Sequence, residues 1–188
     1  MRFVSVVFGL ALSVACTLAF GKDGGETLLV SSPPGYKIDY QAKNDRMITT
    51  EMVPEKQSVK NWTEMVTIQV FYGLKASPEQ FMGRVEEQVK EACPGAEVTL
   101  IRQGKENGYP FNLFLQHCPL NKETGKLEIT WFKTTEGNDS FYVVQFATKH
   151  EPAKETITKW MQYLASAIVC DTRSTEHACG PAPGSGQR

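Results

Sequence analysis

Apolar and polar residues alternate along most of this chain, which is the pattern of strands with one buried side. Within 109–117, for example, Phe111, Leu113 and Leu115 lie two positions apart. The same alternation marks the stretches 36–40, 46–53, 62–71, 97–103, 127–135 and 140–149. Short polar turns separate neighbouring stretches, and the Asn-Gly pair at 107–108 is a strong hairpin signal. The sequence therefore predicts antiparallel strands joined by hairpins.

Two stretches instead space their apolar residues three or four positions apart, as an amphipathic helix does. The first begins at Ser77-Pro78-Glu79-Gln80, which supplies a capping hydroxyl, a proline and a Gln that can close a capping box. It ends before Cys93, and the second runs from Pro152 to just before Cys170. The apolar stripes are Phe81, Val85 and Val89 in the first helix, and Ile157, Trp160, Met161, Leu164 and Ile168 in the second.

The order of these elements predicts an α+β fold. Strands, a helix, four strands and a second helix follow one another, with hairpin-like connections between strands. Each helix has a single apolar stripe and the strands offer an apolar side. We therefore expect an antiparallel sheet of about six to seven strands with two helices packed on one face. The length suits a single domain, which we place at 28–179.

The N-terminus has the composition of an export signal. Arg2 precedes the apolar run 3–20, and small residues stand before Lys22. A positive end, an apolar core of this length and small residues before the cut are what a signal peptidase recognises. We expect residues 1–21 to be removed and the protein to be periplasmic or secreted. The alternatives are a retained membrane anchor and a lipid anchor at Cys16.

Signal removal would leave polar ends and an almost balanced charge. Residues 22–27 and 180–188 are small and polar, so we expect a flexible N-terminus and a disordered tail. The chain has 20 Lys and Arg against 21 Asp and Glu, and the loss of Arg2 makes this 19 against 21. There is no basic run, which argues against binding to nucleic acid. No membrane span is expected after signal cleavage.

Four cysteines remain once Cys16 is removed with the signal, and an even count in an oxidising compartment indicates two disulfides. Four cysteines allow three connectivities. We favour Cys93 with Cys118 and Cys170 with Cys179, because each pair is close in sequence and lies where an element meets a loop. The alternative is a metal site formed by Cys170, His177 and Cys179, although this spacing matches no common zinc pattern.

Signatures of catalysis are absent from the sequence. It contains no Gly-x-Ser-x-Gly, His-Glu-x-x-His or phosphate-binding Gly-rich motif. His117 stands next to Cys118, but adjacent strand residues point to opposite faces, so these two are not placed to form a catalytic pair. We expect no catalytic residues, no metal ligands and no cofactor, and therefore a protein that is not an enzyme.

One strand is apolar on both sides. Tyr142, Val144 and Phe146 alternate with residues that are also apolar, and Phe132 lies on the preceding strand. Such a strand is either covered on both faces or exposes a patch where something docks. We expect these four residues to form a helix-free sheet face that binds a protein or an apolar ligand.

The stretch Gly137-Asn138-Asp139-Ser140-Phe141-Tyr142-Val143-Val144-Gln145-Phe146 and the helix that follows it, up to residue 170, resemble the PsbP-like fold family. This family is named for an extrinsic subunit of photosystem II and includes the bacterial lipoprotein DcrB. The resemblance extends in element order over 28–170 and implies a binding, scaffolding or assembly role. The four cysteines are a departure, since the family does not require them.

Three functions remain open from the sequence. The leading prediction is an exported, non-enzymatic binding or assembly module stabilised by disulfides. The second is an extracytoplasmic metal-binding protein or enzyme that uses Cys170, His177 and Cys179. The third is a periplasmic inhibitor or immunity-type protein, which would bind its target through the same kind of apolar surface as the first.

Overall fold

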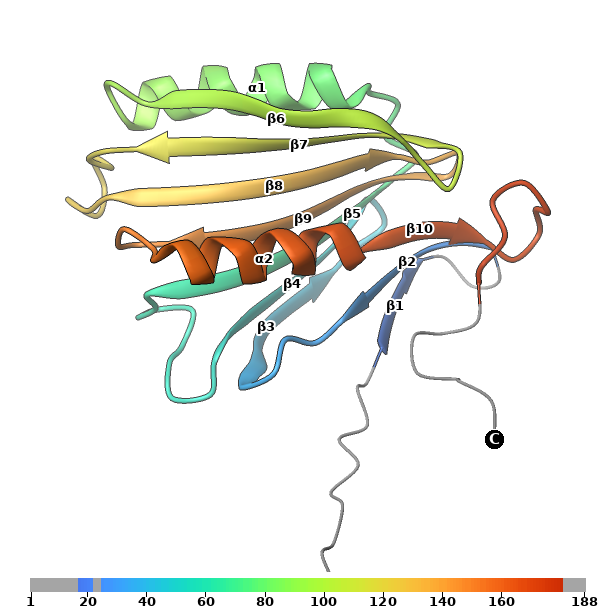
Figure 1. The fold of residues 1–188 in the computed structure, drawn as a ribbon, viewed down its shortest axis with the longest axis horizontal. Coiled ribbons are helices and arrows are strands. Elements are labelled where there is room, and N and C mark those ends of the chain that lie inside the picture. The colour runs from blue at the N-terminus through green and yellow to red at the C-terminus, as the bar shows by residue number, and fades with distance from the viewer. Residues whose placement is uncertain (1–16, 22–24, 181–188) are drawn as a thin grey trace, which may run out of the picture.

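The computed structural model describes residues 17–21 and 25–180 (Figure 1). In chain order its elements are β1 (Thr17–Gly21), β2 (Glu26–Ser31), β3 (Tyr36–Lys43), β4 (Met47–Pro54), β5 (Glu64–Tyr72), α1 (Pro78–Ala92), β6 (Glu97–Glu106), β7 (Tyr109–Cys118), β8 (Glu128–Glu136), β9 (Ser140–Thr148), α2 (Lys154–Ser166) and β10 (Ile168–Asp171). Cys16, the alternative lipidation site, and residues 181–188 of the predicted tail lie outside the described residues.

The described strands pair antiparallel in two sheets. Within residues 17–21 and 25–180, a large sheet has seven strands in the order β3-β4-β5-β9-β8-β7-β6, and a small sheet has three in the order β1-β2-β10. Hairpins join most neighbours, as the alternation predicts. β5 and β9 are also neighbours although α1 and three strands separate them in the chain. The predicted α+β class and antiparallel sheet are confirmed.

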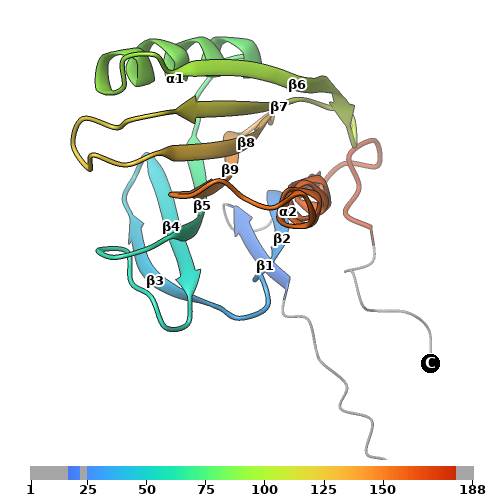
Figure 2. The ribbon, with the colours of Figure 1, turned by 60° about the vertical axis from the view of Figure 1, so that its left-hand side comes forward.

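The two helices cover opposite faces of the large sheet, which corrects the prediction that both pack on one face (Figures 1 and 2). Trp160 and Leu164 of α2 pack in a cluster with Val144 and Phe146. The α1 residues Phe81, Met82 and Val85 pack against a separate cluster, whose buried members are Phe114, Phe132, Phe141 and Val143. The reason is that β8 and β9 are apolar on both sides, so each side needs its own cover.

The small sheet lies next to α2 and helps to close that face (Figure 2). Ile168, which the sequence assigns to the second helix, instead begins β10, because α2 ends at Ser166. The side chain of Ile168 is exposed, whereas Val169 is buried in the same cluster as α2. The helical spacing of Ile168 is therefore fortuitous, and β2 and β10 are strands that the pattern did not reveal.

β2 is fixed to the large sheet by a buried carboxylate. Glu26 is 2% exposed and accepts hydrogen bonds from the backbone N–H groups of Asn138, Asp139 and Ser140. It also accepts the hydroxyl of Tyr142 at 3.1 Å. Four donors offset the cost of burying this carboxylate. β2 therefore begins inside 22–27, the stretch predicted to be flexible, because Glu26 finds its partners only in the tertiary structure.

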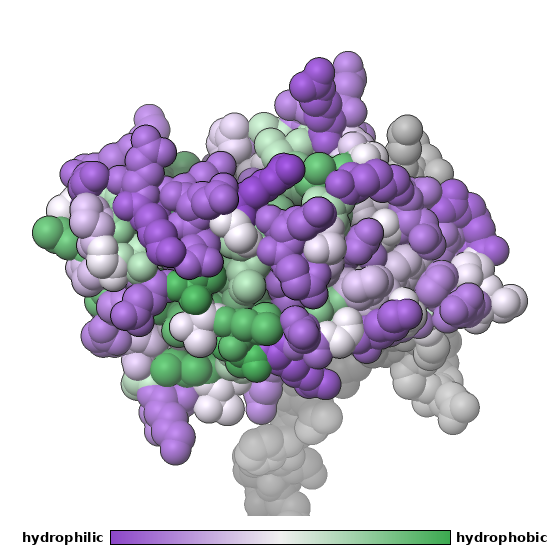
Figure 3. Space-filling view, turned by 90° about the horizontal axis from the view of Figure 1, so that it is seen from above, coloured by the Kyte–Doolittle hydropathy of each residue, from purple (hydrophilic) through white to green (hydrophobic). Residues whose placement is uncertain are grey.

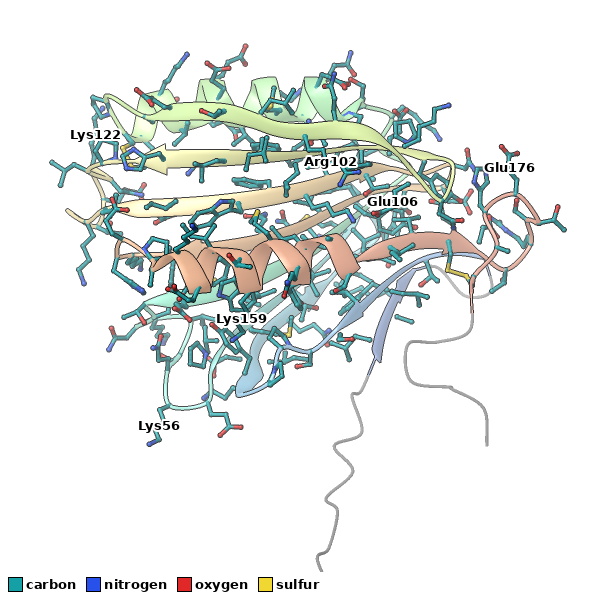
Figure 4. All side chains as sticks on the ribbon, in the orientation of Figure 1. Lys56, Arg102, Glu106, Lys122, Lys159 and Glu176 are labelled. Atoms are coloured by element: carbon teal, nitrogen blue, oxygen red, sulfur yellow. A yellow bond between two sulfur atoms is a disulfide. The ribbon has the colours of Figure 1, made fainter. Side chains whose placement is uncertain are left out.

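Both disulfides favoured by the sequence are present. Cys93–Cys118 joins the C-terminal cap of α1 to the end of β7. Cys170–Cys179 joins β10 to the loop that follows it. Figure 4 shows the bonded sulfur atoms in yellow. In the described part of the chain, neither helix is long and apolar enough to cross a membrane.

Candidate functional site

The structure buries the four residues that were predicted to form a partner-binding face. The exposed fractions are 6% for Phe132, 1% for Tyr142, 2% for Val144 and 0% for Phe146. Phe132 packs on the α1 side of the large sheet, and the other three pack on the α2 side. The prediction of an exposed, helix-free face formed by these residues is wrong. They are apolar because each belongs to a core cluster on one side of the large sheet.

The alternative site at Cys170, His177 and Cys179 is not arranged for metal binding. The two sulfur atoms are bonded to each other, so neither is a thiolate ligand. The His177 ring stacks on Tyr109 with 4.3 Å between ring centroids, and its Nδ1 lies 2.9 Å from the Asn107 carbonyl. Among residues 17–21 and 25–180, no group of three or more His, Cys, Asp or Glu side chains could hold a metal ion.

A cleft of about 660 Å³ opens between α1 and the large sheet. Its apolar lining comes from both walls and includes Phe71, Leu74, Phe81, Val85 and Phe132. Its polar lining is Gln69, Arg84, Gln88, Gln116, Asn121 and Gln145. Figure 3 looks from above, where α1 and β6 lie, and shows apolar patches among charged side chains. A concave site with an apolar body and a few converging polar groups is the usual form of a ligand pocket.

The N-terminus of α1 is held in place by local capping and by the sheet. The Ser77 hydroxyl accepts the N–H of Gln80 at 3.2 Å, and the Gln80 side chain accepts the N–H of Ser77 at 2.9 Å. This is the capping box that the sequence predicts. The Asn112 amide, buried on β7, donates to the Pro78 carbonyl at 2.8 Å. The start of the helix is therefore tied to the sheet.

The C-terminus of α1 is held by covalent and polar links. Cys93 is bonded to Cys118 of β7. The Lys122 ammonium donates to the Glu91 carbonyl at 2.8 Å, and its backbone N–H donates to the Ala92 carbonyl at 3.1 Å. Figure 4 labels Lys122 at the end of the sheet where these links lie. With both ends of α1 fixed, the width of the cleft is set before any ligand arrives.

Amide groups from neighbouring strands meet on the sheet wall of the cleft. The Gln145 NH₂ group on β9 donates to the Gln69 carbonyl on β5 at 3.0 Å. That bond does not use the NH₂ group of Gln69 or the carbonyl of Gln145. Arg84, on α1, adds an exposed guanidinium on the other wall. The two walls together offer a cation and amide donors to an acceptor-rich group.

The polar surface continues along the sheet beyond the cleft. Residues directly opposite each other in neighbouring strands share a face, and this relation links Glu51 of β4, Thr67 of β5 and Gln145 of β9. Burial raises the pKa of Glu51 above its ordinary value. These three residues therefore continue the polar lining of the cleft along the same face of the sheet.

The charged and nucleophilic side chains of the cleft lining are few. Among the described residues that line it, Arg84 carries the only charge and none is a Ser, Cys or His. Apolar contact and hydrogen bonding are the interactions that such a lining supplies. The sequence did not indicate this site, because Gln69 and Gln145 come together through the non-local pairing of β5 with β9.

A protein-family model matches residues 35–170. No curated protein sequence matches the chain. Among solved structures, the solution structure of the cyanobacterial PsbP called CyanoP, from Synechocystis sp. PCC 6803, is similar with a TM-score of 0.51 at 13% identity. The match covers 86% of this chain and 96% of CyanoP. This likeness shows the fold and confirms the resemblance seen in the sequence.

Two structures of Mog1 are also similar. The Ran-binding protein Mog1p of Saccharomyces cerevisiae has a TM-score of 0.45 at 14% identity, and a Mog1 mutant has a TM-score of 0.48 at 12% identity. Each match covers 80% of this chain and 85% of the other. The chain has a PsbP-like fold, and it belongs to the family whose model matches residues 35–170.

Proposed function

We propose that this protein is an extracytoplasmic, non-enzymatic binding module whose ligand site is the cleft beneath α1. The observation that supports this most is a ready-formed cleft of about 660 Å³ with apolar residues on both walls and converging polar groups. Small-molecule sites typically measure about 300–1,000 Å³. The volume therefore suits a small ligand.

The lining indicates the chemistry of the ligand. Phe71, Phe81 and Phe132 offer a surface to an apolar body. The Arg84 guanidinium and the Gln69 amide offer donors to an anionic or carbonyl-bearing head. We therefore assign an amphipathic small molecule with an acceptor-rich, acidic head as the ligand class.

The disulfides support an extracytoplasmic location. Cys93–Cys118 and Cys170–Cys179 would be reduced in most cytosols but persist in a periplasm or outside a cell. This agrees with the predicted export signal over 1–21. The location and the cleft are linked parts of the proposal, since the Cys93–Cys118 bond that attaches α1 to β7 persists only in an oxidising compartment.

Anilinonaphthalene sulfonate is a suitable probe, because it combines an apolar ring system with an anionic group. We expect it to bind the folded protein and Arg84→Gln to weaken that binding by about tenfold, the usual value of a hydrogen bond to a charged group. Val85→Trp should also weaken binding, since Val85 lines the cleft and a larger side chain would fill it. Fluorescence titration measures both effects.

Arg102→Gln is the matched control for charge. Arg102, labelled in Figure 4, lies on β6 opposite Leu113, a residue of the α2-side cluster. The control removes the same charge away from the cleft and should leave probe binding within about twofold. Equal weakening by Arg84→Gln and Arg102→Gln, or unchanged binding in Val85→Trp, would rule out the cleft as the site. Near-ultraviolet circular dichroism checks that each variant is folded.

A further inference from the structure

The outer strand of the small sheet is the segment that the export prediction removes. β1 pairs antiparallel with β2 along its whole length, from Thr17 opposite Ser31 to Gly21 opposite Thr27. Phe20 is 7% exposed and belongs to the main core cluster. Leu18 packs partly against the same cluster. A cut after Gly21 would therefore remove a paired strand together with an apolar side chain of the core.

β2 is built to remain in place when β1 is gone. Its other edge pairs with β10. Its inward side chains Leu28 and Val30 are buried in the main core cluster, and Glu26 is fixed to the turn before β9. Cleavage would therefore leave an ordered strand with one open edge, whose N–H and C=O groups can pair with another extended chain.

The surroundings of β1 define what fits beside β2. A groove of about 310 Å³ runs between Leu18, Ala19 and Phe20 and a second wall. That second wall is formed by Ile38, Gln41, Lys43 and Ile48 of β3 and β4. Removal of Leu18 and Phe20 would enlarge this groove and leave two apolar positions empty, two residues apart. The outward Ala19 is exposed, so the position between them needs no particular side chain.

We infer that the exported chain uses the open edge of β2 as a docking site for an extended peptide segment of a partner protein. The segment lies antiparallel to β2 and places apolar side chains at two alternate positions, in the sites of Leu18 and Phe20. Main-chain hydrogen bonds supply the affinity, and the two apolar sites supply the selectivity, as in other cases of strand addition. This site is separate from the α1 cleft.

The test uses the chain that begins at Lys22 and a synthetic peptide with the sequence of residues 17–21 flanked by lysines for solubility. The peptide should bind this shortened chain and should bind the chain that retains β1 at least tenfold more weakly. Phe20→Ser in the peptide should weaken binding at least tenfold, because it removes the buried aromatic ring. N-methylation of the Phe20 amide in the peptide should abolish binding, because the N–H of Phe20 faces β2 opposite Leu28 and its loss removes a ladder bond without changing the side chain.

Hydrogen exchange locates the bound peptide, since amides on the open edge of β2 should exchange more slowly when it is present. N-terminal sequencing of the exported protein shows whether Thr17–Gly21 is removed. Retention of these residues, failure of the Lys22 chain to fold, or equal binding of the peptide N-methylated at Phe20 would each overturn the inference. Dimerisation of the Lys22 chain through β2 would overturn it as well, because the occupant would then be a second copy.

Discussion

The two faces of the large sheet differ in how completely they are covered. On the α2 face, Trp160 stacks on Phe146 with 3.9 Å between ring centroids, and Phe146 stacks on Trp131 at 5.9 Å. The small sheet adds Leu28, Val30 and Val169 to the same cluster. On the α1 face, aromatic stacking is also present, with Phe81 5.1 Å from Phe141. There, however, the cleft lies between the helix and the strands.

Under the proposed function, this difference means that one sheet serves stability on one side and binding on the other. A helix and a second sheet together close the α2 face. The α1 face has a single helix, so strands β4 and β5 carry Glu51, Thr67 and Gln69 at its polar margin. Burial of apolar side chains is the main stabilising term of the fold. We therefore expect ligand binding at the α1 face, where the burial of apolar side chains is incomplete.

The largest expected difference in the free energy of unfolding is between variants of two adjacent residues on β9. Phe146→Ala should lower the free energy of unfolding by about 3–5 kcal/mol, because it removes a fully buried ring from the α2 face. Gln145→Ala, one residue earlier on the α1 face, should cost only about 1 kcal/mol, since it removes one hydrogen bond in a half-buried site. Urea unfolding measures both. Similar losses for the two variants would show that the faces do not differ as described.

Removal of either disulfide should have an effect of intermediate size on the free energy of unfolding. The chain-entropy relation gives about 3.5 kcal/mol for the Cys93–Cys118 loop and about 2.7 kcal/mol for the Cys170–Cys179 loop. Paired Cys→Ala variants should lower the free energy of unfolding in that order. Removal of Cys93–Cys118 should also weaken probe binding in the cleft, because it releases one end of α1. Removal of Cys170–Cys179 should leave that binding unchanged, which titration of both variants checks.

The smallest expected effect is that of acid on stability. Low pH should destabilise the small sheet more than the region of the cleft. Hydrogen bonds from the Arg173 side chain and backbone lower the pKa of Asp171, on β10, to about 2. Since its unfolded pKa is near 3.9, the stabilisation is complete above about pH 4 and disappears as the pH falls from 4 towards 2. Thermal unfolding across this range should be less pH-dependent in Asp171→Asn. An unchanged pH dependence in that variant would contradict this role.

Local patterns identified most elements and the disulfide pairing. The Ser77 capping box, the Asn107–Gly108 turn and the alternation in β7 to β9 are set by residues close in sequence, so they were readable without a structure. β2 and β10 could not be identified from local patterns, because each is short and is stabilised by partners far along the chain. Ile168 shows the limit of periodicity, since its spacing fitted a helix that ends two residues earlier.

The amino-acid sequence by itself determined the α+β class, the antiparallel hairpins, both helices and the two sulfur–sulfur pairs, because these depend on local periodicity, caps and short loops. Only the tertiary structure decided that the helices take opposite faces, that Gln69 and Gln145 meet in a cleft, and that β1 lies against β2. The periodicity of a segment shows that it has an apolar side, but not which distant segment will cover that side.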